Sequence, residues 1–243
     1  MEQPVAATAA PSRFVLWLHG LGDNGRANEP VAGYAFAGAR WAFPTAPTAP
    51  VTCNRGARMP SWFDIHDTPI TSKSVKGEED VLRSVQSVHA MIDREISAGT
   101  SPEDVFVFGL SQGGALSIAS VLLYPKTLGG CAVFSGFLPF GPSFASRVTA
   151  EAKKTPVLWV HGRADYLVPI EAGQDGTKFL KGIGMSCEFK VYHELGHGLE
   201  PYELEYCERW AGKRSSEPAG TKSVGIGVPG RKSSCCGLSF SIS

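Results

Sequence analysis

Residues 105–115 read VFVFGLSQGGA, a continuous apolar run followed by a serine that stands between two glycines. The run Val105–Phe108 is typical of a strand that is buried on both faces, and the residues after the serine, through Tyr124, favour a helix. The pattern Gly-x-Ser-x-Gly between a strand and a helix is typical of the nucleophile elbow of a serine hydrolase. Such a turn exposes the serine hydroxyl and directs unpaired helix N–H groups at the reacting centre.

The elbow pattern is weak evidence by itself, because the chain has 28 glycines. The rest of the chain supports it through the order of its elements. Apolar runs predict further strands at 14–18, 40–43, 130–134, 156–160 and 187–192. Helices are predicted at 27–36, 78–98, 171–182 and 201–210, with a short one at 146–153. Alternation of strand and helix predicts an α/β fold, with a mostly parallel central sheet and helices on both faces.

Changes in composition divide the chain into three parts. Residues 1–12 are rich in Ala, Pro and Thr and are expected to form a flexible lead-in, followed by one α/β domain over 13–212. Residues 213–243 are rich in Ser, Gly and Lys, which predicts a disordered tail. Within the domain, the Pro- and Gly-rich segment 44–61 is expected to be irregular, and the polar segment 65–77 to be mobile.

Charge and cysteine content exclude several classes of function. The chain has 23 basic and 23 acidic side chains, which argues against a general electrostatic nucleic-acid binder. No apolar run reaches about 18 residues and no secretory signal is evident, so we expect no membrane span and a cytoplasmic location. The six cysteines lack metal-site spacing, which favours reduced thiols. The pair Cys235 and Cys236 lacks a prenylation box and is interpreted as a chance pair.

The first predicted strand ends in a glycine-rich loop, HGLGDNG at residues 19–25. Alone, such a loop is most simply a flexible turn. Beside a nucleophile elbow, a loop of this kind is expected to supply the second donor to a tetrahedral oxyanion. We therefore expect the backbone N–H groups of Leu21 and Gln112 to hold the oxyanion, with the Leu21 assignment a hypothesis.

A second loop concentrates aromatic side chains in the sequence MPSWFD at residues 59–64. Trp62 and Phe63 form either a hydrophobic plug on the core or one wall of a substrate pocket. The sequence does not decide between these two interpretations.

An activated serine needs a base, and in this fold the acid and then the base follow the nucleophile in the chain. His197 stands between two glycines in the loop after the last strand and is the favoured base, ahead of His193. His19 and His161 end strands beside glycines and are expected to be structural.

Asp165 follows the strand at 156–160 and is the favoured acid, whereas Asp175 falls within a predicted helix. Its expected role is to fix the tautomer of the His197 imidazole and to stabilise the imidazolium. The order Ser111, Asp165, His197 predicts attack of Ser111 on a carbonyl carbon, an acyl-enzyme, and its hydrolysis by water that His197 activates. This chemistry requires no metal and no cofactor.

Short motifs together resemble the acyl-protein thioesterase / carboxylesterase family of α/β-hydrolases over about residues 13–212. They are His19-Gly20-Leu21-Gly22-Asp23, Pro60-Ser61-Trp62-Phe63-Asp64, Gly109-Leu110-Ser111-Gln112-Gly113-Gly114, His161-Gly162-x-x-Asp165 and Gly196-His197. The sequences of residues 51–54 and 122–130 resemble those of the plant branch of probable carboxylesterases. The resemblance implies the triad Ser111, Asp165 and His197 and the oxyanion donors Leu21 and Gln112.

The resembled family hydrolyses fatty acyl thioesters on proteins, lysophospholipids and small esters. This implies acyl ester or thioester substrates, including S-acylated or acetylated proteins. Residues 1–12 contain no cysteine for a lipid anchor, so stable membrane insertion is not expected. Residues 65–76 are polar where long-chain thioesterases often place an apolar lid, which favours short acyl groups over palmitoyl groups.

The alternative function is that of a non-catalytic ligand-binding or receptor protein on the same fold. The sequence does not indicate the oligomeric state.

Overall fold

Six parallel strands form the central sheet of the computed structural model, in the order β2-β1-β5-β6-β7-β8. The structure describes residues 13–32 and 35–213, so the predicted lead-in and the tail from residue 214, with Cys235 and Cys236, lie outside it. The strands are β1 (Phe14–Leu18), β2 (Arg40–Ala42), β5 (Val105–Leu110), β6 (Gly130–Phe134), β7 (Val157–Gly162) and β8 (Cys187–Tyr192). All neighbouring pairs are parallel, which confirms the predicted sheet.

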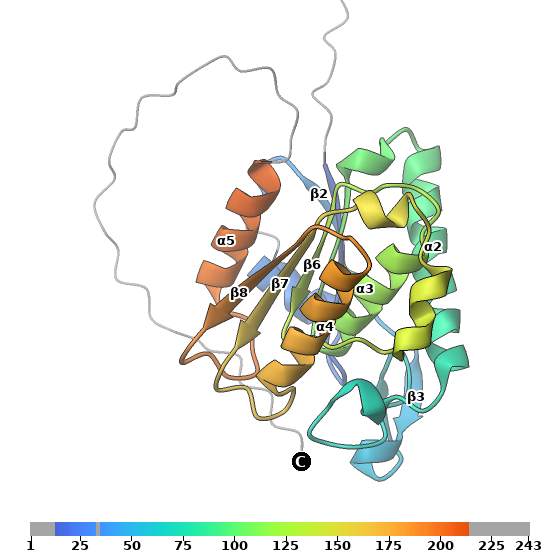
Figure 1. Ribbon diagram of the computed structural model, residues 1–243, viewed down its shortest axis with the longest axis vertical. Helices are drawn as coiled ribbons and strands as arrows, with labels where there is room; N and C mark the ends of the chain where they lie inside the picture. The colour runs from blue at the N-terminus through green and yellow to red at the C-terminus, as the bar shows by residue number, and fades with distance from the viewer. Residues whose placement is uncertain (1–12, 33–34, 214–243) are drawn as a thin grey trace, which may run out of the picture.

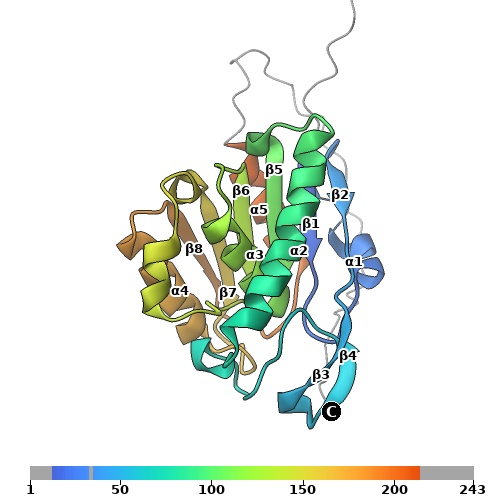
Figure 2. The ribbon, with the colours of Figure 1, turned by 90° about the vertical axis from the view of Figure 1, so that its right-hand side faces the viewer.

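Helices cover both faces of the sheet, as predicted. They are α1 (Gly25–Ala32), α2 (Glu78–Ser97), α3 (Gln112–Leu123), α4 (Ile170–Gly182) and α5 (Pro201–Gly212). Helices α2, α3 and α4 lie on one face, and α1 and α5 lie on the other (Figures 1 and 2). Side chains of β1 alternate accordingly: Leu16 and Leu18 join the core beneath α2 and α3, while Val15 and Trp17 join the core beneath α1 and α5.

Helix α3 is buried on all sides, from Gln112 through Leu122. Its sequence is apolar around the whole circumference, which is the pattern of a helix inside a core rather than on a surface. It lies against β5 and β6 on one side and α2 on the other. Ser111, which precedes α3, is therefore attached to a helix that is enclosed by the core.

The segment 44–61, predicted to be irregular, contains an antiparallel hairpin of β3 (Thr48–Val51) and β4 (Ala57–Pro60). Its turn places Arg55 and Gly56 at positive φ, 55° and 78°. The strands are short and contain prolines, which are rare in strands except at edges. The prolines are therefore the reason why the sequence did not predict the hairpin.

The segment 65–77, predicted to be mobile, is instead anchored in the core. Ile65, Ile70 and Ser74 are buried, and the Ile70 N–H donates to the Leu167 carbonyl at 2.7 Å. The buried side chains are spaced irregularly among polar ones, so no periodic pattern marks them in the sequence.

The predicted short helix at 146–153 is absent. Two 3-10 turns, Pro142–Arg147 and Ala152–Lys154, stand there instead. The Thr149 hydroxyl accepts the Ala152 N–H at 3.0 Å. This side-chain bond offers the backbone an alternative to helical hydrogen bonds and interrupts the helix.

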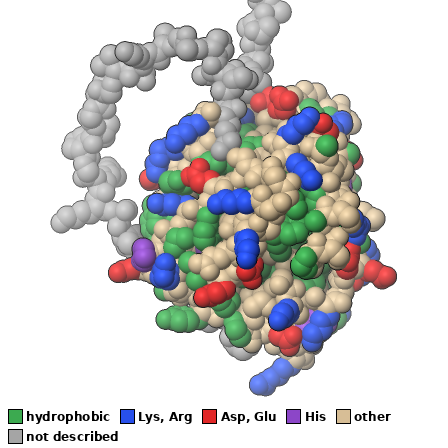
Figure 3. Space-filling model, in the orientation of Figure 1, with side chains coloured by type: hydrophobic (Ala, Val, Ile, Leu, Met, Phe, Trp, Pro, Cys, Tyr) green, Lys and Arg blue, Asp and Glu red, His purple; other side chains and the backbone are tan. Residues whose placement is uncertain are grey.

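The cysteines within the described residues, Cys53, Cys131, Cys187 and Cys207, are all free thiols. No helix in that part of the chain is long and apolar enough to cross a membrane. Basic and acidic side chains are interspersed on the face shown in Figure 3, in keeping with the zero net charge of the sequence.

Candidate active site

Ser111 occupies the sharp turn between β5 and α3, with φ 56° and ψ −119°. A non-glycine residue at positive φ is strained and requires support from its surroundings. The support comes from the backbone, because the Ser111 N–H donates to the Phe134 carbonyl at 2.8 Å and the Ser111 carbonyl accepts the Ala115 N–H at 3.0 Å. The hydroxyl-bearing Cβ is thereby fixed at the carboxyl end of the sheet.

The glycines on either side of Ser111 are required by close backbone approach. A Cβ at Gly109 would lie 2.4 Å from the Gly113 carbonyl oxygen, and one at Gly113 would lie 2.0 Å from the Leu18 carbonyl oxygen. The first turn of α3 thus packs directly against the end of β1. This contact brings the loop after β1 next to Ser111.

Ser111, His197 and Asp165 form one chain of hydrogen bonds. His197 Nε2 lies 3.0 Å from Ser111 Oγ, and His197 Nδ1 lies 2.8 Å from Asp165 Oδ2. Ser111 and Asp165 are 5% and 4% exposed, so both bonds are largely shielded from water. The loops after β5, β7 and β8 contribute one residue each.

The hydrogen bonds of Asp165 set the direction of the chain. Asp165 Oδ1 accepts the N–H groups of Leu167 at 3.0 Å and Val168 at 2.8 Å, which leaves Oδ2 for the imidazole. A carboxylate only accepts, so His197 Nδ1 carries the proton and Nε2 is free to accept from the Ser111 hydroxyl. This is the tautomer that a general base requires.

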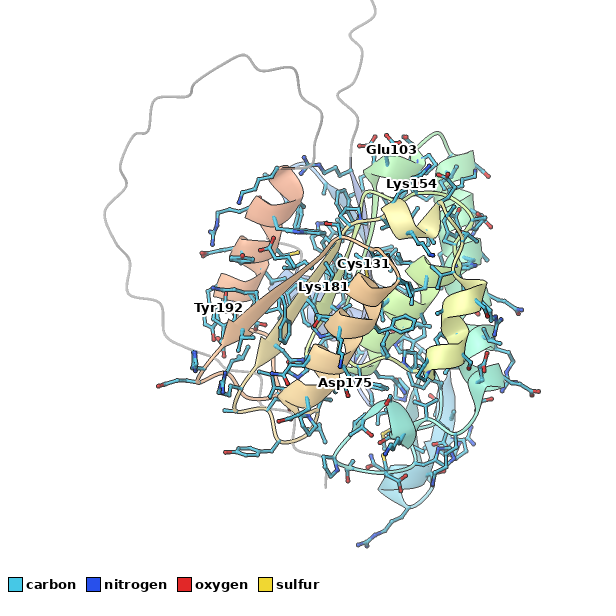
Figure 4. The ribbon with its side chains drawn as sticks, in the orientation of Figure 1. Glu103, Cys131, Lys154, Asp175, Lys181 and Tyr192 are labelled. Carbon is cyan, nitrogen blue, oxygen red and sulfur yellow. The ribbon has the colours of Figure 1, made fainter. Side chains whose placement is uncertain are left out.

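The other candidate acids and bases do not reach Ser111. His193 is exposed in the loop after β8, and Asp175 is exposed on α4 (Figure 4). His161 is fully buried, and its Nε2–H donates to the Val168 carbonyl at 2.8 Å. Burial lowers the pKa of His161, so this imidazole stays neutral and its 3.7 Å approach to Asp165 is not an ion pair.

His19 lies beneath the glycine-rich loop. Its Nδ1–H donates to the Gly20 carbonyl at 2.7 Å, and its Nε2 accepts the Ala46 N–H at 2.9 Å. Burial lowers the pKa of His19, which keeps the ring in this neutral tautomer. The Gly20 carbonyl belongs to the same peptide group as the Leu21 N–H, so His19 fixes the plane of that peptide.

The predicted oxyanion donors Leu21 and Gln112 belong to the loop after β1 and to the first position of α3. Leu21 lines the same cavity as Ser111 and His197, and a Cβ at Gly20 would lie 3.5 Å from the Ser111 Cβ. Within residues 13–32 and 35–213, neither the Leu21 nor the Gln112 N–H has a hydrogen-bond acceptor. Both donors are therefore free to bind an oxygen atom beside Ser111.

The cavity at Ser111 is small, about 30 Å³. It is lined by Gly20, Leu21, Asp23, Ile70, Leu110, Ser111, Leu167 and His197. A larger, mostly apolar groove of about 560 Å³ is lined in part by Thr71 and Pro169, which are near Ile70 and Leu167 in the chain. Ile70 and Leu167, joined by their backbone hydrogen bond, form part of the wall of the cavity at Ser111. Sequence reasoning missed both residues, because nothing local marks them.

Trp62 and Phe63 lie in the core, 6% and 4% exposed, and neither lines the cavity at Ser111. Phe63 packs edge-to-face on Phe137, and Trp62 contacts the His19 ring. Of the two interpretations that the sequence left open, this position fits a hydrophobic plug on the core rather than one wall of a substrate pocket. Among all the described residues, no group of three or more His, Cys, Asp or Glu side chains is placed to hold a metal ion.

Comparison with known proteins identifies the family of the chain. Residues 3–211 match the family model described as phospholipase/carboxylesterase. A protein of rice (Oryza sativa subsp. japonica) named probable inactive carboxylesterase is 75% identical over 87% of this chain and 88% of its own length. Carboxylesterase SOBER1 of Arabidopsis thaliana is 55% identical over 83% of this chain and 90% of its own length.

Solved structures show the same relation. The crystal structure of SOBER1 matches with a TM-score of 0.81 at 55% identity, over 84% of this chain and 99% of that one. Acyl-protein thioesterase 2 of Zea mays matches with a TM-score of 0.75 at 29% identity, over 86% of this chain and 96% of that one. The chain belongs to the phospholipase/carboxylesterase family of α/β-hydrolases, a family of carboxylic ester and thioester hydrolases.

Proposed function

We propose that this protein is a serine esterase that cleaves carboxylic esters or thioesters through Ser111, His197 and Asp165. The observation that carries the proposal is the unbroken chain of hydrogen bonds from Asp165 Oδ2 through His197 to Ser111 Oγ, at 2.8 Å and 3.0 Å. Family membership supports the same chemistry.

In the first step, His197 Nε2 takes the proton of Ser111 as Oγ attacks the carbonyl carbon. The N–H groups of Leu21 and Gln112 hold the resulting oxyanion. His197 then protonates the leaving alcohol or thiol, and an acyl-enzyme forms. A water molecule that gives its proton to His197 attacks the acyl-enzyme, and the free acid and the Ser111 hydroxyl are released.

The acyl group of the preferred substrate is short. A cavity of about 30 Å³ holds little more than one small group, and the side chains of Ile70 and Leu167 form part of its wall. Small esters and acetylated proteins fit this space better than palmitoyl thioesters. The protein acts on these substrates in the cytoplasm, as the free thiols favour.

A chain-length series tests this substrate class. We expect p-nitrophenyl acetate and butyrate to be cleaved faster than longer esters, and Ser111→Ala to lower kcat by at least about a thousandfold. The Ile70→Ala variant enlarges the cavity at Ser111 and should shift the preference toward longer chains, whereas Ile92→Ala, a core truncation on α2, should not. Faster cleavage of palmitoyl than of butyryl thioester by the wild type would refute the short-acyl preference.

A ligand-binding protein without turnover is the second candidate, and the name of the rice relative favours it. In that case the protein would bind an ester or acid at the Ser111 cavity and release it unchanged. Product formation by the wild type and its loss in Ser111→Ala distinguish the two functions.

A further inference from the structure

We propose that Trp62 is a positioning residue that holds the two oxyanion donors, Leu21 and Gln112, at a fixed separation. The inference rests on the proposed esterase function and assigns a task to a core residue that touches no reacting atom. Trp62 belongs to the segment Pro60–Phe63, which begins at the last residue of β4 and is hydrogen-bonded both to the loop after β1 and to the first residue of α3.

The first set of bonds fixes the Leu21 peptide from both sides. The Trp62 indole N–H donates to the His19 carbonyl at 2.9 Å, and the Trp62 and His19 rings lie 5.1 Å apart. On the other side of Leu21, the Gly22 N–H donates to the Pro60 carbonyl at 2.9 Å. The glycine-rich loop is thereby tied to Pro60–Phe63 before and after the donor.

The second set of bonds fixes Gln112. Its side-chain amide is fully buried, and Oε1 accepts the Trp62 backbone N–H at 3.1 Å. Its Nε2 donates to the Phe63 carbonyl at 2.7 Å and to Ser61 Oγ at 3.0 Å. Every hydrogen bond of this side chain therefore ends in residues 61–63, and the backbone N–H of the same residue is the second oxyanion donor.

Within residues 60–63, Trp62 is the residue with hydrogen bonds to both sides, through its indole N–H to the His19 carbonyl and its backbone N–H to Gln112 Oε1. A third contact holds it from behind, because the Ser84 hydroxyl on α2 donates to the Trp62 carbonyl. The first turn of α3 already packs on the end of β1. An indole has one donor on a rigid ring, so its bond to the His19 carbonyl adds a fixed link from the loop after β1 to the segment that holds Gln112.

The separation of the donors matters only when charge develops on the substrate oxygen. Oxyanion donors act at about 2.7–3.1 Å from the oxyanion rather than from the ground-state carbonyl oxygen. A displaced Leu21 N–H therefore stabilises the transition state less and leaves substrate binding nearly unchanged. If the role of Trp62 were purely structural, replacing it would lower the amount of folded protein instead of kcat.

The test compares Trp62→Phe with Trp159→Phe. Phe keeps a buried aromatic ring but lacks the N–H, and Trp159 is a fully buried tryptophan whose Nε1 has no partner among the described residues. We measure kcat and KM on p-nitrophenyl acetate per active site, after titration with a fluorophosphonate. Affinity for an alkyl boronic acid, which forms a tetrahedral adduct on the serine, is measured in parallel.

We expect Trp62→Phe to lower kcat per active site by about tenfold, a fraction of the loss caused by removing a whole oxyanion donor, with KM changed by less than about twofold. The affinity for the boronic acid should fall with kcat. Trp159→Phe should leave all three quantities within about twofold of the wild type. Should Trp62→Phe fail to fold, Ser61→Ala, which removes one bond to Gln112, should lower kcat by about threefold at constant KM.

Equal kcat per active site in Trp62→Phe and Trp159→Phe would overturn the inference, as would a loss of kcat without a loss of boronic-acid affinity. An unchanged kcat in Ser61→Ala would overturn it where Trp62→Phe does not fold. These results differ from failure of the esterase function, in which the wild type itself cleaves no ester and takes up no fluorophosphonate.

Discussion

At the residue scale, the reactivity of Ser111 depends on which nitrogen of His197 carries the proton. Asp165 decides this, because its Oδ1 is occupied by two backbone N–H groups and its Oδ2 accepts from His197 Nδ1. An amide in place of the carboxylate presents a donor to the imidazole and reverses the tautomer.

We expect Asp165→Asn to lower kcat by about 10⁴-fold near neutral pH with little change in the unfolding midpoint, since geometry is kept and the tautomer is lost. The matched control is Asp175→Asn, an exposed residue on α4 that contacts no member of the triad. Ester hydrolysis at saturating substrate measures the effect. Retention of more than about a tenth of the wild-type kcat in Asp165→Asn would remove Asp165 from the mechanism.

The order of residues in the sequence was enough to choose Ser111, Asp165 and His197, because strand ends of a parallel sheet meet at one edge. The task of Trp62 was not predictable, because its indole partner His19 is 43 positions away in the chain. Ile70 escaped prediction for the same reason, since its partner Leu167 belongs to a distant loop. Local sequence patterns do not reveal contacts between residues that are so far apart in the chain.

At the element scale, the elbow depends on the contact between α3 and β1. Gly113→Ala would place a Cβ 2.0 Å from the Leu18 carbonyl oxygen, and a backbone atom there has no room to move. We expect a loss of about 3 kcal/mol in unfolding free energy, or failure to fold. Gly212→Ala, where a Cβ meets nothing within 4 Å, should leave stability unchanged in the same urea titration. Equal stability of the two variants would mean that the elbow tolerates a wider separation from β1.

The first turn of helix α5 contains a buried acidic side chain. Glu203 is fully buried, its Oε2 accepts the Glu200 N–H at 2.8 Å, and its Oε1 has no partner among the described residues. Burial raises the pKa of Glu203 to about 8, from an ordinary value of 4.5. The folded protein therefore keeps a proton that the unfolded chain loses near pH 4.5, and the contribution of Glu203 to stability falls as pH rises toward 8.

Because an amide cannot ionise, Glu203→Gln should gain stability relative to the wild type as pH rises, by at least about 2 kcal/mol between pH 5 and pH 8. Urea unfolding at several pH values measures the difference. Glu205→Gln, at an exposed position of the same helix, is the control and should show no such trend. A difference between Glu203→Gln and wild type that is independent of pH would show that Glu203 is ionised in the folded protein.

At the scale of the whole molecule, the fold brings the loops after β1, β5, β7 and β8 to one edge of the sheet. The alternation of apolar runs and helices predicts this arrangement because each parallel strand needs a crossover helix. The hairpin of β3 and β4 and the anchored segment 65–77 lie outside that alternation. Their positions are set by tertiary packing, so the border of the cavity was the least predictable part of the site.

The most direct test of the central claim is covalent labelling of the folded wild-type protein with a fluorophosphonate probe, read by mass spectrometry of its peptides. A serine that is deprotonated by His197 and flanked by oxyanion donors reacts with such a probe, whereas an ordinary serine does not. We predict that the label resides on Ser111, is absent from Ser111→Ala, and is lost when the protein is unfolded before labelling. A folded wild-type protein that carries no label on Ser111 would contradict the account.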